Sequence, residues 1–208
     1  MYSHMLRGEG EDTLTCKLSK KGVFDVRSYY KLLFGPYNEG FPQECIWCAK
    51  VPKWVSFFLW TTARDGILTI DNLVKRGQTL VNRYCLYCCD GETVDHLLLH
   101  CKFSHALWSA IFEVFGIHWL MLMAVSSLLV AWRNWFGKHL STIWNMVLAC
   151  LMWLVWTERN KRIFEDKEGT LDLLKALLFG TLFQWAHVWG FMNCISIFDF
   201  LHSIRLSL

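Results

Sequence analysis

Proline, net charge and long apolar runs are all scarce in this 208-residue sequence. It has 3 Pro and no internal repeat or biased tract, which excludes a collagen-like or low-complexity chain. The formal net charge is only +3 and is spread evenly, so no segment is a basic domain. Apolar material, in contrast, is plentiful: 54% of the residues are hydrophobic and 12 are Trp, which is ample for a core and excludes disorder.

Neither of two apolar stretches has the uninterrupted length of a membrane span. Residues 117–132 are broken by His118 and two Ser, and residues 143–156 by Asn145. A transmembrane helix needs roughly 18–20 consecutive apolar residues, so buried helices of a soluble core are the better interpretation. The second stretch is apolar around most of its circumference, and a membrane-associated helical protein, attached through residues 143–156 or 171–201, therefore stays an alternative.

The N-terminal residues lack the apolar segment of a secretory signal. We therefore expect an intracellular protein of the nucleus or cytoplasm that is not secreted. The 9 Cys then stand in a reducing compartment, where metal binding is favoured over disulfide formation.

Four metal-ligand side chains follow one another at C-x2-C-x7-H-x4-C spacing: Cys85, Cys88, His96 and Cys101. Two Cys separated by two residues can turn both sulfurs toward one point, and a turn at Asp90-Gly91 can bring the later His and Cys there. A closed Cys3His set leaves no position for an activated water, so the predicted Zn²⁺ stabilises the chain and does not catalyse a reaction.

Two other side chains, and one condition on the helix, keep alternatives open around this site. Cys89 or His100 could replace a neighbouring ligand, and buried Cys that bind no metal would show the same residue types. His96 lies on the first turn of a helix that Thr93 can cap, so it shares a metal with Cys101 only if the helix ends or bends before Cys101.

A second C-x2-C pair, Cys45 and Cys48, has no partner pair nearby. A thiol-redox protein is the corresponding alternative function. The aromatic helix expected after this pair, with no preceding β-α unit, argues against a thioredoxin-like protein.

Periodicity and capping residues predict a mainly α fold with a small β-hairpin at the N-terminus. Thr69 and Thr170 are expected N-caps, and Ser104 is expected to precede a helix that Gly116 ends. The predicted hairpin falls within residues 12–26, and the predicted helices span about 29–34, 52–64, 70–75, 93–100, 105–115, 119–136, 142–164 and 171–192. We expect a zinc-stapled module at 12–116 and a helical C-terminal extension at 117–208.

The one local charge excess precedes the cysteines, where six basic residues face two acidic ones between residues 50 and 83. Such an arm could neutralise phosphates and support weak, salt-sensitive binding of RNA or DNA, although solvated helix faces have similar charge runs. The neighbouring aromatic residues are assigned to the core, since base stacking needs exposed rings. Residues 158–162 are interpreted as a solvated helix end. The basic residues are Lys50, Lys53, Arg64, Lys75, Arg76 and Arg83.

A series of anchors in fixed order resembles the reverse transcriptase zinc-binding domain of plant LINE-type (non-LTR) retrotransposons. The similarity covers roughly residues 12–110 and continues more weakly at 153–164. The anchors are Phe24, Tyr30, Ile46, Trp47, Pro52, Lys53, Trp60, Leu68, Asn72, Arg76, Gly77, Cys85, Cys88, Glu92, His96, Cys101 and Trp108. The chain departs from the family's pattern at Cys16, where a Trp is usual.

The resemblance implies zinc binding and contact with template RNA or DNA or with other retroelement proteins. It implies no small-molecule substrate and no enzyme activity. The sequence has no aromatic-x-Asp-Asp motif and no paired carboxylates set for two-metal catalysis, so nothing in it resembles the polymerase itself. We expect a non-catalytic module derived from a retrotransposon polyprotein.

Overall fold

A computed structural model describes residues 41–79, 91–118, 121–132, 138–191 and 194–206. These residues are helical with no strand among them, which confirms the mainly α prediction. The chain divides into two compact units, Met1–Phe41 and Pro42–Leu208, and only the second is described in detail. The predicted hairpin and the predicted helix at 29–34 lie outside the described residues.

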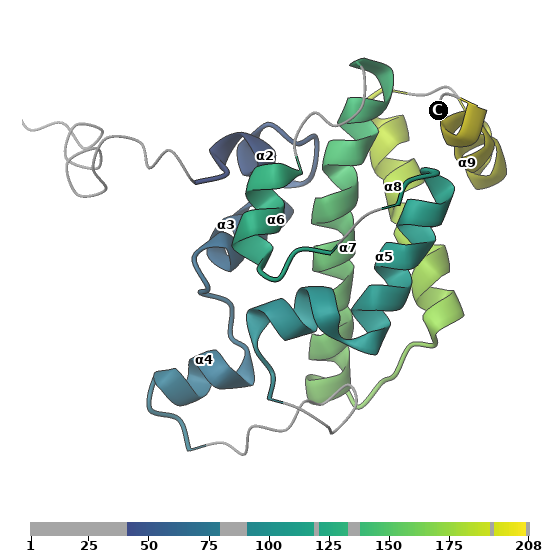
Figure 1. Ribbon diagram of the computed structural model, residues 1–208. Coiled ribbons are helices and arrows are strands. Elements are labelled where there is room, and N and C mark those ends of the chain that lie inside the picture. Colours follow the sequence, from purple (N-terminus) through teal and green to yellow (C-terminus); the bar gives the residue numbers. More distant parts are fainter. Residues whose placement is uncertain (1–40, 80–90, 119–120, 133–137, 192–193, 207–208) are drawn as a thin grey trace, which may run out of the picture. The chain divides into compact units, whose positions relative to one another are not determined.

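Figure 1 shows how the helices of the second unit gather around one long helix. Eight α-helices and one π-helical turn, η1, are described. In chain order they are α2 (Gln43–Trp47), α3 (Lys53–Ala63), α4 (Ile70–Lys75), η1 (His96–His100), α5 (Lys102–Val114), α6 (Val125–Ala131), α7 (Lys138–Phe164), α8 (Leu171–Val188) and α9 (Ile197–Leu206).

The predicted caps account for several of these boundaries. Thr69 Oγ1 accepts a hydrogen bond from Asn72 N at 3.4 Å, and Thr170 Oγ1 accepts one from Leu173 N at 3.2 Å, so both are the N-caps that the sequence predicts. Gly116, at the predicted end of α5, has φ +55°, a conformation that glycine adopts without strain.

Two predicted boundaries are wrong, and one helix was not predicted. Helix α5 begins at Lys102, because Cys101 and not Ser104 is its N-cap. Helix α6 begins only at Val125, whose amide donates to Asp95 Oδ1 at 2.7 Å, a tertiary contact that local sequence does not show. Helix α9, which the sequence did not predict, follows α8.

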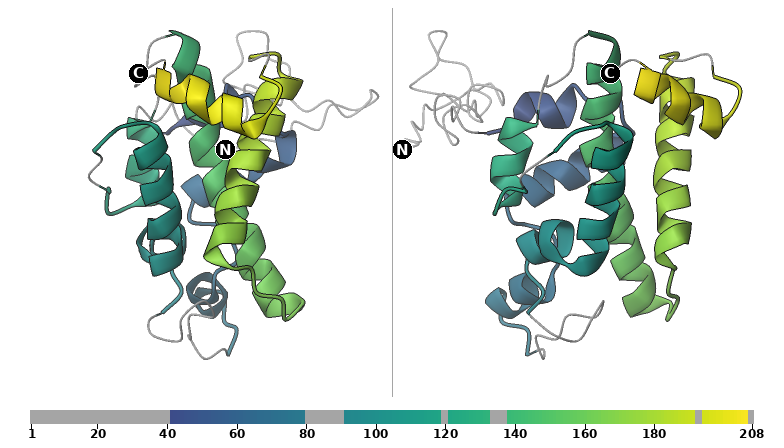
Figure 2. Two further views of the ribbon diagram at one scale, coloured as in Figure 1. Left: turned by 90° about the vertical axis from the view of Figure 1, so that its right-hand side faces the viewer. Right: turned by 45° about the vertical axis from the view of Figure 1, so that its right-hand side comes forward.

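Helix α7 is the centre of the packing. It contacts α3, α5, α8 and η1, and Figure 2 shows α7 and α8 side by side. Because neighbours surround it, every residue from Met146 to Met152 is buried. The proposed boundary near residue 116 stays a prediction, but α5 packs on α7 and α8, so helices from its two sides share one core.

The same helix contains the one described segment, Leu140–Phe164, that is long and apolar enough to cross a membrane. Of its most apolar window, with mean hydropathy 1.5, 61% is buried inside the protein. The central helix of a soluble protein passes the same test of length and composition, so this segment is weak evidence for a membrane span.

A stacked pair of Trp rings fixes the N-terminal half of α7. The rings of Trp132 and Trp144 lie 4.0 Å apart and nearly parallel at 8°. Trp132 Nε1 donates to Trp144 O at 2.9 Å, and Trp144 Nε1 donates to Trp132 O at 3.1 Å. Trp108 and Phe115 of α5 meet this pair edge-on, so both buried indole N–H groups are satisfied inside an aromatic cluster.

We predict that Trp144→Ala lowers the free energy of unfolding by about 3–5 kcal/mol, because it empties a fully buried site and leaves Trp132 without its partner. Urea unfolding followed by circular dichroism measures the change. Phe164→Ala, at a position 76% exposed, is the control and should change stability by less than about 0.5 kcal/mol. Equal effects of the two substitutions contradict the prediction.

Candidate metal site and nucleic-acid interface

Two of the four predicted zinc ligands, His96 and Cys101, lie in the described part of the chain. Cys85, Cys88 and the spare ligand Cys89 fall within residues 80–90, outside it. Among the described residues no group of three or more His, Cys, Asp and Glu side chains could hold a metal ion. The Cys3His set therefore stays a prediction. The structure describes the positions of two of its members, His96 and Cys101.

The helix that carries His96 ends before Cys101, as a shared metal requires. Thr93 Oγ1 accepts from His96 N at 3.2 Å and caps this helix, as the sequence predicts. The π-helical turn ends at His100, and Cys101 has extended backbone angles of φ −64° and ψ 150°. Cys101 N donates to His96 O at 2.8 Å, which holds the backbones of the two residues together.

The Cys101 sulfur lies at the N-terminus of α5. Cys101 is buried, with only 2% of the residue exposed. Ser104 N donates to its Sγ at 3.3 Å, and Ser104 Oγ lies 3.2 Å from the same atom. Backbone N–H groups at a helix N-terminus suit an anionic ligand. A thiolate, the form in which Cys binds zinc, would meet one donor already in place, the Ser104 backbone N–H.

Side chains of α5 take up the carbonyl groups that η1 leaves unpaired. Ser104 Oγ donates to Leu97 O at 2.5 Å, and Trp108 Nε1 donates to Leu98 O at 3.0 Å. The last turn of any helix needs such partners. Trp108, an anchor of the resemblance, thus holds the segment that carries His96 against α5.

His100, the spare His ligand, already has a backbone partner. Its Nε2 lies 2.9 Å from Met123 O, and Asp95 on the other side of η1 accepts from Val125 N. Both side chains therefore hold the segment that leads into α6.

Glu92 connects the candidate metal segment to α7 and α4. Arg159 Nη2 lies 2.5 Å from Glu92 Oε1, and Arg159 Nε lies 3.1 Å from both carboxylate oxygens. The side chains are 0% and 4% exposed. Ile70 N donates to Glu92 Oε1 at 3.0 Å and Asp71 N donates to Glu92 O at 3.2 Å, so the first turn of α4 is attached to the same residue.

The interpretation of residues 158–162 as a solvated helix end is wrong for Glu158, Arg159 and Arg162, whereas Lys161 is exposed. Glu158 and Arg159 are buried, and Arg162 Nε lies 2.8 Å from Glu158 Oε1. Gly169 N donates to Glu158 Oε1 at 2.7 Å, and Arg162 Nη2 donates to Gly169 O at 3.1 Å. These charged side chains hold the connection between α7 and α8, a role that periodicity cannot reveal.

The second Cys pair has poor geometry for thiol chemistry. Cys45 is buried, and burial raises the pKa of its thiol to about 12, while Cys48 is exposed at the end of α2. A nucleophilic redox Cys needs an accessible thiolate near neutral pH. The structure therefore disfavours the thiol-redox alternative.

The predicted basic residues do not form one patch. Lys50 Nζ lies over the Trp189 ring at 5.2 Å, and Lys75 pairs with Asp65 and Asp71. Arg76 Nη2 donates to Gly66 O at 3.1 Å, and Arg83 lies outside the described residues. The two that remain, Lys53 and Arg64, lie at opposite ends of one face of α3.

Lys53, Phe57, Trp60 and Arg64 form what we name the α3 stripe. Their spacing of four, three and four residues places them on one helical face. Phe57 is 58% exposed and stacks on Trp60 at 5.5 Å, and the Arg64 guanidinium lies 4.6 Å from the Trp60 ring centroid. No acidic residue occurs in α3. Two stacked aromatic rings thus lie between two cations on one face of the helix.

The assignment of the 46–60 aromatic residues to the core holds only in part. Phe58 is 5% exposed and packs on Trp153 and Trp156 of α7. Trp54 is 64% exposed, and Trp47 and Phe57 are also exposed. Helical spacing decides the face of α3 on which each ring lies, but only the tertiary packing decides which face is covered.

Comparison with known proteins places the metal segment in a family context. Residues 24–108 match the family model described as zinc-binding in reverse transcriptase. The match includes all four predicted zinc ligands and the α3 stripe. It supports a reverse-transcriptase-type zinc-binding domain of retrotransposon origin.

A curated protein of Arabidopsis thaliana, named "Putative ribonuclease H protein", is 25% identical over 177 residues. The aligned region covers 79% of this chain and 27% of the relative, so the chain spans about a quarter of the relative's length. No solved structure matches the chain.

We predict that Glu92→Ala lowers the free energy of unfolding by about 3–5 kcal/mol, because it leaves the buried Arg159 guanidinium without its carboxylate. Glu168→Ala is the matched control. Its carboxylate is 75% exposed and lies 3.7 Å from Arg162, so the loss should stay below about 1 kcal/mol.

A Glu92→Leu/Arg159→Met double variant should recover much of the stability, because it removes both buried charges together. Urea unfolding of the three variants beside the wild-type chain measures these differences. A Glu92→Ala loss no larger than that of the control shows that the buried pair is not a structural constraint.

Proposed function

We propose that this chain is a non-catalytic zinc-binding module, derived from the reverse transcriptase polyprotein of a plant LINE-type retrotransposon, that contacts single-stranded RNA or DNA. The observation that carries the proposal is the α3 stripe, where the exposed ring of Phe57 and the half-buried ring of Trp60 lie between the cations Lys53 and Arg64. The family match at residues 24–108 supports the zinc-binding part.

The proposed metal site consists of Cys85, Cys88, His96 and Cys101. Its support is the family match, the end of η1 directly before Cys101, and the Ser104 N–H that donates to the Cys101 sulfur. A zinc ion there would tie the Cys85–Cys88 segment to the N-terminus of α5. Because the set is closed, the metal stabilises the chain and activates no water.

The proposed nucleic-acid contact relies on stacking and charge together. Every base presents a planar face, so rings such as Phe57 can stack on single strands without reading their sequence. Lys53 stands at the first position of α3, where the helix macrodipole disfavours a cation. Lys53 is exposed there, so its ammonium can reach a phosphate of a bound strand. Other retroelement proteins are further proposed partners, in the nucleus or cytoplasm.

We predict about one bound zinc per chain in purified protein and none in a Cys85→Ser/Cys88→Ser double variant, measured by elemental mass spectrometry. The variant should also lose protection from hydrogen exchange at residues 91–101, because metal binding contributes to folding there. A Cys45→Ser/Cys48→Ser variant is the matched control and should keep its zinc. Folded wild-type protein without zinc contradicts the metal site.

We predict that Phe57→Ala weakens binding of a fluorescein-labelled oligouridylate of about 12 nucleotides by at least about fivefold, since one base–ring stack contributes about 1–3 kcal/mol. Phe198→Ala, at a still more exposed ring on α9 (81% exposed), is the control. Lys53→Gln should reduce the slope of log affinity against log salt by about 0.7, the value for one phosphate contact on a single strand. Unchanged affinity and slope in both variants exclude the α3 stripe as the interface.

A further inference from the structure

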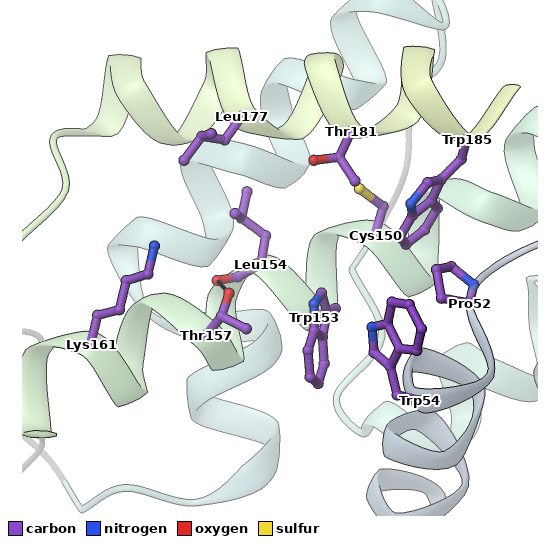
Figure 3. Close-up of a pocket in the computed structure, with 10 residues that line it drawn as sticks. All are labelled: Pro52, Trp54, Cys150, Trp153, Leu154, Thr157, Lys161, Leu177, Thr181 and Trp185. Carbon is purple, nitrogen blue, oxygen red and sulfur yellow. Dashed lines mark hydrogen bonds between the residues drawn. The ribbon is translucent and has the colours of Figure 1, made fainter. Parts of the chain in front are cut away.

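A groove with a volume of about 270 Å³ lies between α3, α7 and α8. Figure 3 shows Trp54 of α3 beside Trp153 of α7, with Trp185 of α8 on the same side and Lys161 at the other end. Thr157 and Thr181 line the space between these ends. Indole rings from three helices therefore bound one end of the groove, and an ammonium group bounds the other.

The rings are available to a ligand and are held by the fold. Trp54 is 64% exposed, and Trp153 is fixed by its edge-on contact with the buried Phe58 at 5.3 Å. An exposed ring beside a fixed one offers a flat aromatic guest two apolar faces, and stacking of this kind is worth about 1–3 kcal/mol per base. The walls thus suit a planar aromatic group.

The charge in the groove is of one sign. Among the described residues that line it, Lys161 alone is charged, and no carboxylate faces the space. Trp153 and Lys161 are eight residues apart on α7, about 12 Å along the axis. Helical side chains lean toward the helix N-terminus, so the ammonium comes back toward the rings. Thr157 Oγ1 donates to Leu154 O at 2.9 Å and keeps its lone pairs for a ligand donor.

We propose that this groove receives one base of a single-stranded RNA or DNA against the indole rings, with a phosphate of the same strand at Lys161. The proposal rests on the proposed nucleic-acid function and extends it. Trp54 directly follows Lys53, the first residue of the α3 stripe, so a strand stacked along the stripe reaches the groove at its rim. A free nucleotide shares this chemistry, but only a strand uses the stripe and the groove together.

The test measures oligouridylate affinity by fluorescence anisotropy for the zinc-loaded full chain and for groove variants. Lys161→Glu should weaken binding about fivefold or more, because it replaces attraction of the phosphate by repulsion. Lys167→Glu makes the same charge change at an exposed side chain outside the lining and should stay within about twofold. Trp54→Ala should weaken binding about fivefold or more through lost stacking. Circular dichroism unfolding curves identify any variant that fails to fold.

Three results overturn the proposal, and they separate it from the function on which it rests. If Phe57→Ala weakens binding while Lys161→Glu and Trp54→Ala do not, the strand follows the α3 stripe and bypasses the groove. If the wild-type chain binds no oligonucleotide, both proposals fail. If uridine monophosphate competes as well as the oligonucleotide and Lys161→Glu abolishes that competition, the groove is a site for free nucleotides.

Discussion

The buried ion pair between Glu92 and Arg159 is the constraint on which the candidate metal segment depends. Two charges without solvent are costly to bury, and they persist only where geometry and further hydrogen bonds compensate. Here the guanidinium binds both carboxylate oxygens, and the same carboxylate accepts from the first turn of α4. One residue next to the predicted ligands thus fixes the positions of α4 and η1 against α7.

This pair also joins the family-matched segment to a helix outside it. The match ends at residue 108, whereas Arg159 lies 67 positions after Glu92 on α7. A chain cut after residue 108 would expose an unpaired Glu92 and the faces of η1 and α5 that pack on α7. The helices after residue 117 are therefore part of the structure that holds His96 and Cys101.

Local signals predicted much of the helical structure, and tertiary contacts decided the rest. Thr69, Thr93 and Thr170 cap helices because capping depends on residues three positions away. The burial of Glu158 and Arg159 could not be derived in this way, because its cause lies in partners at Gly169 and Glu92. A cluster of charges at the end of a long apolar helix reads the same whether water or protein surrounds it. The assignment of zinc ligands within residues 85–89 rests on their spacing in the sequence alone.

The exposed rings of α3 are the feature that folding leaves unexplained. The opposite face of the α3 stripe already supplies Val55, Phe58 and Leu59 to the core, whereas Phe57 stays 58% exposed. Scattered apolar residues at a surface need no explanation. Aromatic rings that lie beside cations, with no acidic residue among them, are typical of surfaces that bind single-stranded nucleic acid. Phe58 of α3 packs on Trp153 of α7, the helix that also carries Arg159. Helix α7 therefore positions both the α3 stripe and the candidate metal segment.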